Sequence, residues 1–296
     1  MNSDLPRITV VTPSFNQAAF VETTILSVLG QCYPNLEYFV MDGGSTDGSA
    51  DIIRRHESQL AHWVSAADGG QSAALNTAFA RATGDIFCWV NSDDFLLPGT
   101  LHRIARSFAG RTHEPRLCYG SCLFFEDQGK RAKVVRARPF DPATLRLSAF
   151  IIQPSAFWTR ALWEKTGPLD QSLSFAFDWD WFIRASAVGS FETCAEILSA
   201  YRLHAAHKSG SGGEKRRREI IDVARRHATP AQVAAYEFLD RHWAALEKQR
   251  GLQSWLEQRR IPAAEMWARL ASRIPGGPPG VTAEELKLCE GMLHGS

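Results

Sequence analysis

Four consecutive polar residues, 91–94 (Asn-Ser-Asp-Asp), directly follow an apolar, strand-like segment. Adjacent carboxylates repel each other, and a divalent cation placed between the protein and a bound phosphate group relieves that repulsion. Oxygen ligands that leave open positions for phosphates suit Mg²⁺ or Mn²⁺. Because Asp and Ser also cap helices, and Pro98-Gly99 is expected to open one, an N-cap is the alternative use of the same residues.

A second polar run, residues 42–49 (Asp-Gly-Gly-Ser-Thr-Asp-Gly-Ser), joins another strand-like segment to a helix. Its glycines permit positive φ angles and a close backbone approach to a ligand. Asp42, at the strand end, is suited to accept hydrogen bonds from a base or a ribose. The glycine spacing differs from the dinucleotide-binding fingerprint, and no phosphate-binding loop ends in Lys-Ser or Lys-Thr.

These polar runs belong to an alternating pattern of strands and helices. Strands are expected at residues 8–11, 36–41, 62–64 and 86–90, with helical patterns between them, among them 71–82. The alternation predicts an α/β fold with a mostly parallel central sheet and flanking helices. In such sheets the ligand crevice lies outside the carboxyl ends of the strands, so the polar residues there are expected to converge on one site.

The alternation of strands and helices gives way to a different pattern after residue 116. Residues 116–137 are expected to form an antiparallel hairpin with a turn at 127–130, followed by helices at 160–165 and 179–188 and a strand at 191–201. Residues 209–213 are rich in Gly and Ser and are interpreted as a linker. The predicted organisation is a domain of residues 1–208, with halves of about 1–110 and 111–208, the linker at 209–213, and a helical C-terminal extension at 214–296.

The composition excludes some classes of function. The 296 residues carry 33 Lys and Arg against 32 Asp and Glu, a net charge of +1, which argues against nucleic acid as a partner. No uncharged stretch reaches the roughly 18 residues of a membrane-spanning helix. The N-terminus lacks the pattern of a signal peptide, and six scattered cysteines favour a reducing compartment, so a cytoplasmic location is expected. Cys118 and Cys122 are interpreted as core positions in preference to a zinc site.

Several motifs, in order along the chain, resemble family 2 glycosyltransferases with the GT-A fold, above all the enzymes that build bacterial cell-surface polysaccharides. The motifs are residues 10–17 (Val-Val-Thr-Pro-Ser-Phe-Asn-Gln), 33–38, 41–49, 68–72, Asn76 and 91–94, and the resemblance spans about residues 8–208. It implies a GT-A (Rossmann-like) sheet. It also implies transfer of a sugar from a nucleotide diphosphate-sugar to a hydroxyl of a saccharide or lipid-linked acceptor.

The resemblance carries roles onto individual residues. Binding of the nucleotide-sugar is implied for Thr12, Pro13, Phe15, Asp42, Asp68, Gln71, Asn76 and Ser92. A divalent cation, Mg²⁺ or Mn²⁺, is implied for Asp93, with Asp94 and His204 beside it, and Lys208 is a candidate for phosphate contact. The first Asp of the family's Asp-x-Asp motif is Asn91 here, whose amide offers an oxygen without charge, so a lower metal affinity is expected.

The catalytic base is expected in residues 175–184, which resemble the family's segment for that role. Asp178 matches the base and is expected to begin a helix. An aspartate among aromatic residues is partly desolvated, which would raise its pKa and make it a better proton acceptor. Asp180 is the competing candidate and is otherwise placed on the acceptor side. Gln153 is also placed there, to orient a sugar hydroxyl, with a plain strand-to-strand turn as the alternative.

The predicted activity is that of a metal-dependent, inverting glycosyltransferase. Two alternatives are kept: an inactive nucleotide-sugar binding or scaffold protein of the same fold, for which Asn91 is the one hint, and a sugar-1-phosphate nucleotidyltransferase. The second alternative should show a Gly- and Arg-rich N-terminal loop for a triphosphate, and residues 12–16 (Thr-Pro-Ser-Phe-Asn) are not such a loop.

The extension begins with a basic segment. Residues 214–227 contain six Lys or Arg and three Asp or Glu. A solvated helix face is the ordinary interpretation, and a patch for anionic lipid headgroups is the other. Because the implied acceptor is lipid-linked, peripheral contact with the inner face of the cell membrane is predicted through this region.

Overall fold

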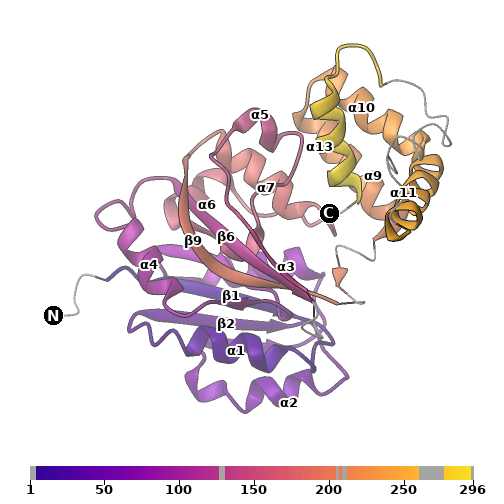
Figure 1. The fold of residues 1–296 in the computed structure, drawn as a ribbon. Coiled ribbons are helices and arrows are strands. Elements are labelled where there is room, and N and C mark those ends of the chain that lie inside the picture. Colours follow the sequence, from indigo (N-terminus) through magenta and orange to yellow (C-terminus); the bar gives the residue numbers. More distant parts are fainter. Residues whose placement is uncertain (1–4, 127–130, 205–206, 209–211, 260–276, 295–296) are drawn as a thin grey trace. The chain divides into compact units, whose positions relative to one another are not determined.

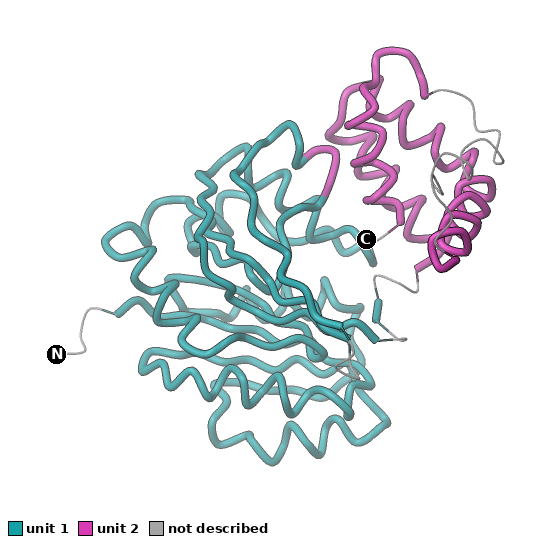
Figure 2. Tube along the Cα trace, viewed as in Figure 1, with its two compact units in different colours: residues 1–145, 149–211 teal, residues 146–148, 212–296 magenta. Residues whose placement is uncertain are grey.

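The computed structural model describes residues 5–126, 131–204, 207–208, 212–259 and 277–294 (Figure 1). The chain divides into two compact units, one of residues 1–145 and 149–211 and the other of residues 146–148 and 212–296 (Figure 2). The turn expected at 127–130 and most of the linker expected at 209–213 lie outside the described residues.

Unit 1 is built on a mixed sheet with nine strands in its described part. The strands are β1 (Ile8–Ser14), β2 (Leu36–Asp42), β3 (His62–Ser65), β4 (Ile86–Trp89), β5 (Phe95–Leu96), β6 (Arg116–Glu126), β7 (Ala132–Val135), β8 (Ala156–Thr159) and β9 (Ser190–Leu203). Their order is β3-β2-β1-β4-β8-β6-β9-β5, and β7 pairs with β6. The α/β class expected from the alternating pattern is confirmed.

The first four strands are parallel, as the sequence predicted. Fully buried β-branched side chains such as Ile8, Val10 and Val40 fill the core around these strands, which favours the extended backbone. The pairing places Ser14 beside Asp42 and Asp42 beside Ser65, so the carboxyl ends of three strands lie at one edge.

The helices of unit 1 connect and cover these strands. They are α1 (Val21–Leu29), α2 (Ser49–Arg54), α3 (Gln71–Arg81), α4 (Thr100–Ser107), α5 (Pro142–Leu145), α6 (Arg160–Thr166) and α7 (Phe177–Ser186), with short 3₁₀ turns at Glu57–Gln59 and Gln153–Ser155. Helices α1 and α2 lie together below the sheet in the view of Figure 1. Helix α7 begins two residues before the predicted start at 179, which puts Asp178 in its first turn.

The second half of unit 1 adds antiparallel strands, among them the predicted β6–β7 hairpin. Strand β9 pairs in parallel with β6 and, towards its end, antiparallel with the two-residue strand β5. Because β5 directly follows residues 91–94, this pairing returns the end of β9 to that polar loop. Cys118 and Cys122 are buried on β6.

Unit 2 is helical in its described part, as the sequence predicted for residues 214–296. Its helices are α9 (Gly213–His227), α10 (Pro230–Arg241), α11 (Trp243–Gln258) and α13 (Ala283–His294). Ile220, Val223 and Tyr236 are buried in its core, and the Tyr236 hydroxyl donates a hydrogen bond to the Leu147 carbonyl. Across the described residues of both units, no helix combines the length and apolarity that a membrane crossing requires.

Candidate active site

Asp42 organises the loop at the carboxyl end of β2. Its carboxylate accepts hydrogen bonds from the Ser45 backbone N–H (2.9 Å), the Ser45 hydroxyl (2.5 Å) and the Ser65 hydroxyl (2.6 Å). The residue is 1% exposed, so these bonds compensate its removal from water. Asp42 therefore fixes the turn after β2 against the end of β3, and any nucleotide contact must use its remaining lone pairs.

Gly43 and Gly44 let other groups approach this loop closely. A Cβ atom at Gly43 would lie 3.3 Å from both the Asp68 Oδ2 atom and the Phe15 ring, and Gly44 has a φ of +81°. Phe15 is 62% exposed, and the Asp68 carboxylate accepts a hydrogen bond from the Gly70 N–H at 2.7 Å. An exposed ring and a carboxylate thus converge on Gly43, an arrangement suited to a nucleoside.

Strand β1 continues past the strand expected at residues 8–11, because Thr12, Pro13 and Ser14 also lie within it. Thr12 is fully buried, and its hydroxyl shares a hydrogen bond of 2.9 Å with the Tyr38 hydroxyl. The strand is longer than the apolar run at residues 8–11 suggested, because residues 12–14 are also buried in the core. Of the residues 12–15, Phe15 is the one that reaches solvent.

Asp93 and His204 form the central pair of the polar loop after β4. The His204 Nε2 atom lies 3.0 Å from the Asp93 Oδ2 atom, although 111 residues separate the two along the chain. The imidazole packs on the Phe20 ring, with 4.7 Å between ring centroids. The predicted association of these two side chains is therefore seen in the fold.

Asp94 is buried, and its expected part in binding the metal stays a prediction. It is 1% exposed, with one oxygen accepting from the Arg202 backbone N–H (3.0 Å) and the other from the Asn91 amide (3.3 Å). Burial and the neighbouring Asp93 raise the pKa of Asp94 well above its usual range, against the opposing effect of those hydrogen bonds. Through these two hydrogen bonds, the buried Asp94 carboxylate fixes the loop of residues 91–94.

Arg202 and Thr24 also hold this loop, and the sequence analysis missed both. The Arg202 guanidinium donates to the Asp93 carbonyl at 3.1 Å and lies between the rings of Phe20 and Phe125. The Thr24 hydroxyl contacts the carbonyl of Asp94 at 2.6 Å. Thr24 sits on the otherwise apolar buried face of α1, and a polar residue in that place was the signal available in the sequence.

Lys208 connects the loop after β4 with the start of α7. Its ammonium donates to the Gln71 side-chain oxygen at 2.8 Å and lies 5.5 Å from the centre of the Phe177 ring. Gln71 in turn donates to Asn91 at 2.8 Å. The three predicted regions, the metal motif, the start of α3 and the base segment, are thereby linked through side chains.

Asp178 and Asp180 lie in the same turn of α7 but in different surroundings. Asp178 is partly exposed, between the buried aromatic residues Phe177 and Trp179. Asp180 is 2% exposed and forms an ion pair with Arg184 at 2.8 Å, whose guanidinium also donates to the carbonyls of residues 166 and 168. Its carboxylate therefore anchors α7, and the acceptor role expected for Asp180 stays a prediction.

Three further predicted residues have structural partners. The Asn76 amide exchanges two hydrogen bonds of 2.9 Å with the backbone of Leu169, and its expected contact with the donor stays a prediction. Ser92 is 4% exposed, so its side chain is also withdrawn from a ligand. Gln153 is buried and donates to the Trp89 carbonyl at 2.6 Å, which places it at the carboxyl end of β4. The acceptor role of Gln153 stays a prediction.

Asp93 and His204 supply an oxygen and a nitrogen that suit a divalent cation such as Mn²⁺. Within the described ranges, no three His, Cys, Asp or Glu side chains gather into a metal-binding group. The pair therefore fits a cation that takes its other ligands from a bound diphosphate and water.

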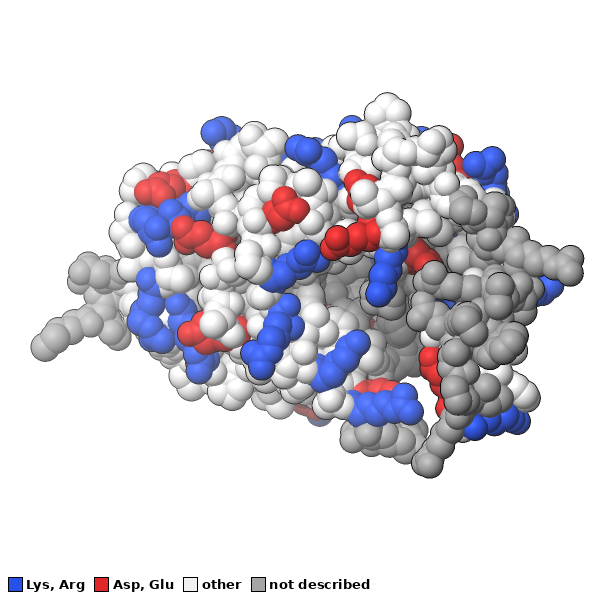
Figure 3. All heavy atoms as spheres, turned by 45° about the horizontal axis from the view of Figure 1, so that its top comes forward, with Lys and Arg blue, Asp and Glu red and all other residues white. Residues whose placement is uncertain are grey.

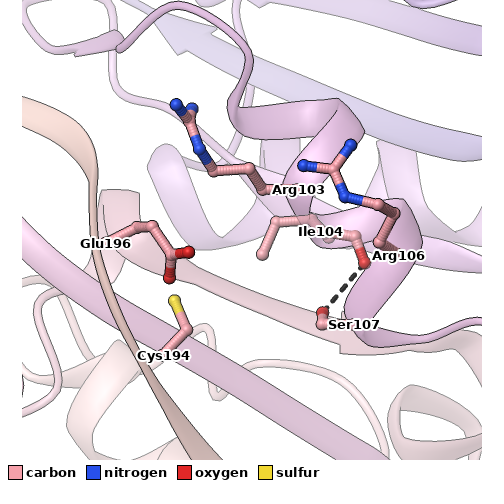
Figure 4. A pocket seen from close by; sticks show the side chains of 6 residues that line it. All are labelled: Arg103, Ile104, Arg106, Ser107, Cys194 and Glu196. Carbon is pink, nitrogen blue, oxygen red and sulfur yellow. Dashed lines mark hydrogen bonds between the residues drawn. The ribbon is translucent and has the colours of Figure 1, made fainter.

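A separate pocket of about 300 Å³ lies between α4 and β9 (Figure 4). Arg103, Ile104, Arg106 and Ser107 line it from α4, and Cys194 and Glu196 line it from β9. None of the predicted site residues takes part in this pocket.

Comparison with known proteins finds similarity to glycosyltransferases. Residues 9–149 match the family model of glycosyl transferase family 2. An uncharacterized glycosyltransferase of Nostoc is 27% identical over 215 residues, covering 68% of this chain and 66% of that protein. The chondroitin synthase of Escherichia coli is 26% identical over 208 residues, covering 69% of this chain and 30% of the synthase. The chain thus spans about two thirds or less of these relatives' lengths.

The fold also has a counterpart among solved structures. The mannosyltransferase PcManGT of Pyrobaculum calidifontis, in complex with GDP-Man and Mn²⁺, superimposes with a TM-score of 0.61 and 20% identity, covering 99% of this chain and 86% of that one. The α/β sheet with its flanking helices is therefore GT-A-like. Residues 9–149 therefore resemble glycosyltransferase family 2, as the motifs implied, and the chain is similar to bacterial glycosyltransferases.

Proposed function

We propose that this chain is a metal-dependent, inverting glycosyltransferase that moves a sugar from a nucleotide diphosphate-sugar to a hydroxyl of a saccharide or lipid-linked acceptor. The observation that carries the proposal is the pairing of Asp93 with His204 in a loop whose Asn91 is linked, through Gln71 and Lys208, to the Phe177 ring that precedes Asp178 in α7. The product would belong to a cell-surface polysaccharide, a proposal supported by the similarity to chondroitin synthase.

The nucleoside would lie at the carboxyl ends of β1 to β3. Phe15 is exposed for contact with a base, and Asp68 faces the same glycine-rich loop. Asp42 keeps that loop in place through its three hydrogen bonds. The diphosphate would then extend towards the loop after β4, where Lys208 supplies a positive charge.

A divalent cation held by Asp93 and His204 would neutralise the charge that develops on the departing diphosphate. Asp178 would accept the proton of the acceptor hydroxyl as its oxygen attacks the anomeric carbon from the face opposite the leaving group. A single displacement of this kind inverts the configuration of the sugar. The buried aromatic residues on either side of Asp178 would exclude water from the proton transfer.

Calorimetry tests the binding part of the proposal. Nucleoside diphosphates are titrated into the protein with and without Mn²⁺, and the expected result is tighter binding with the metal. Asp93→Ala should remove the gain from Mn²⁺, whereas Glu164→Ala, which removes an exposed carboxylate of α6, should keep it. Equal affinities with and without Mn²⁺ would refute metal dependence.

Turnover separates the enzyme from an inactive binding protein of the same fold. Donor sugars are screened with saccharide and lipid-linked acceptors, and the anomeric configuration of the product is read by NMR. Tight, metal-dependent binding without transfer to any acceptor would favour the scaffold alternative, and retention of configuration would refute a single displacement.

The predicted contact with the membrane stays a proposal. Its support is the basic segment of α9, but Arg217, Arg218 and Arg225 of that segment are paired with carboxylates. Basic and acidic side chains are also interspersed over the face seen in Figure 3. Co-sedimentation with vesicles containing anionic lipid should fall when Lys215 and Arg226 are changed to Glu; unchanged binding would contradict this route.

A further inference from the structure

Four side chains form a continuous line of hydrogen bonds beneath the candidate active site. Lys208 Nζ donates to Gln71 Oε1 (2.8 Å), Gln71 Nε2 donates to Asn91 Oδ1 (2.8 Å), and Asn91 Nδ2 donates to Asp94 Oδ2 (3.3 Å). We propose that Gln71 and Asn91 are positioning residues that align Lys208 and the loop of Asp93, and that residue 91 is an amide because this line runs in one direction only.

The direction follows from the two ends of the line. An ammonium group has donors and no acceptor, and both Asp94 oxygens act as acceptors, one for the Arg202 backbone N–H and the other for the Asn91 amide. Each amide between them must therefore turn its oxygen towards Lys208 and its nitrogen towards Asp94. Reversing either amide would set two donors or two acceptors against each other, so one orientation of Gln71 and Asn91 satisfies the whole line.

The buried end of the line explains why Asn91 replaces the first Asp of the motif. Asp94 is 1% exposed, and its other oxygen already accepts the Arg202 backbone N–H. A carboxylate at position 91 could still accept from Gln71, but its second oxygen would place another acceptor against Asp94, where the Asn91 amide now donates. The resulting repulsion in a buried place would displace the loop that carries Asp93.

The other end of the line reaches the base segment. Lys208 lies over the Phe175 and Phe177 rings, at 5.9 and 5.5 Å from their centres, next to Asp178. The amide at position 91 would thus influence the donor phosphates through Lys208 and the loop of Asp93, without contacting the phosphates itself. This consequence for catalysis rests on the proposed function; the hydrogen-bond line itself does not.

The test is an exchange of the side-chain groups at positions 91 and 94. In Asn91→Asp, two carboxylates meet, and in Asp94→Asn, two amide nitrogens meet. In the double variant, the new amide at position 94 would accept from Arg202 and donate to the new carboxylate at position 91. That carboxylate would also accept from Gln71, so every bond of the line is restored. We expect each single variant to lower the melting temperature by several degrees and the double variant to recover most of the loss.

The exposed Gln59→Glu serves as the control for the effect of an amide-to-carboxylate change in unit 1 and should leave the melting temperature nearly unchanged. If the losses of the two single variants simply add in the double variant, Asp94 acts through its charge and the proposal is wrong. If Asn91→Asp alone melts like the wild type, the proposal is also wrong.

A second variant tests the middle of the line at a partly exposed residue. Gln71→Glu keeps the acceptor for Lys208 but removes the donor to Asn91. A carboxylate oxygen of residue 71 would then face the Asn91 Oδ1 atom, which is also an acceptor. We expect the KM for the donor to rise about tenfold or more, with a smaller change in kcat. An unchanged KM would overturn the positioning role. If the wild type turns over no donor at all, the proposed function fails, while the melting temperatures still decide on the hydrogen-bond line.

Discussion

The two units place their charged side chains in different ways. In unit 1 the decisive contacts join distant residues: Asp93 meets His204, and Asp94 meets Arg202 across 108 residues. In unit 2 the arginines of α9 pair partly with acids of their own helix, as Arg218 does with Glu214 four residues earlier. Contacts between distant residues are fixed by the sheet and build a site, whereas the local pairs of α9 neutralise a helix surface.

This difference predicts that single substitutions have large and specific effects in unit 1 and small effects in unit 2. The largest effect is expected at the base.

Asp178→Asn should lower kcat for sugar transfer by about 100- to 10,000-fold, the usual contribution of a general base. Nucleotide binding and the melting temperature should stay close to those of the wild type, because Asp178 is only partly buried. Product formation is measured at saturating donor. Glu164→Gln, on the exposed side of α6, is the control, and a kcat of Asp178→Asn within threefold of that control would show that another group acts as the base.

Asp180→Asn should instead act on stability. Removing one partner of a buried ion pair costs about 3 kcal/mol or more, and Arg184 would lose the carboxylate that orients it towards residues 166 and 168. Denaturant unfolding measures the loss. If Asp180→Asn kept full stability and abolished transfer, the roles given to Asp178 and Asp180 would have to be exchanged.

Glu37→Gln should reveal a dependence of stability on pH within unit 1. Burial by itself raises the pKa of Glu37, but hydrogen bonds from Thr83 and Thr9 and the charge of Arg7 outweigh it, so the pKa is lowered from 4.5. A lowered carboxyl pKa contributes stability above the unfolded value, and that contribution disappears as pH falls through the folded value.

We therefore expect Glu37→Gln to cost about 1–3 kcal/mol at pH 7, and the difference from the wild type to shrink below about pH 4.5. Unfolding curves at a series of pH values measure it. A difference that stayed constant down to about pH 3 would contradict the lowered pKa.

The smallest effect is expected in unit 2. Arg218→Ala removes an ion pair whose side chains are 72% and 62% exposed, and such surface pairs contribute about 0–1 kcal/mol. Unfolding of the whole chain should barely change. A loss comparable to that of Asp180→Asn would remove the contrast between the two units.

The fold was largely predictable because its signals are local. Short apolar runs, glycine-rich strand ends and helical spacing repeat along residues 8–90, and parallel strands joined by helices are the ordinary way to bury such segments. The helical character of residues 214–296 was equally visible. The return of β9 to β5 was not, because a two-residue strand leaves almost no pattern in a sequence.

The candidate site was predictable in its position and only partly in its members. The sequence determined that carboxylates gather at the strand ends and that Asp178 begins a helix among aromatic residues. The resemblance favoured Asp93 over Asp94 and Asp178 over Asp180, but it left the second member of each pair as a candidate.

The tertiary structure gave a physical difference between the members of these pairs. Asp94 and Asp180 are withdrawn from solvent and satisfied by Arg202, Asn91 and Arg184, whereas Asp93 and Asp178 keep partial exposure. Burial and hydrogen-bond partners decide which carboxylate is available for chemistry. For Asp94, one of those partners comes from a strand more than a hundred residues away, where no local pattern can reveal it.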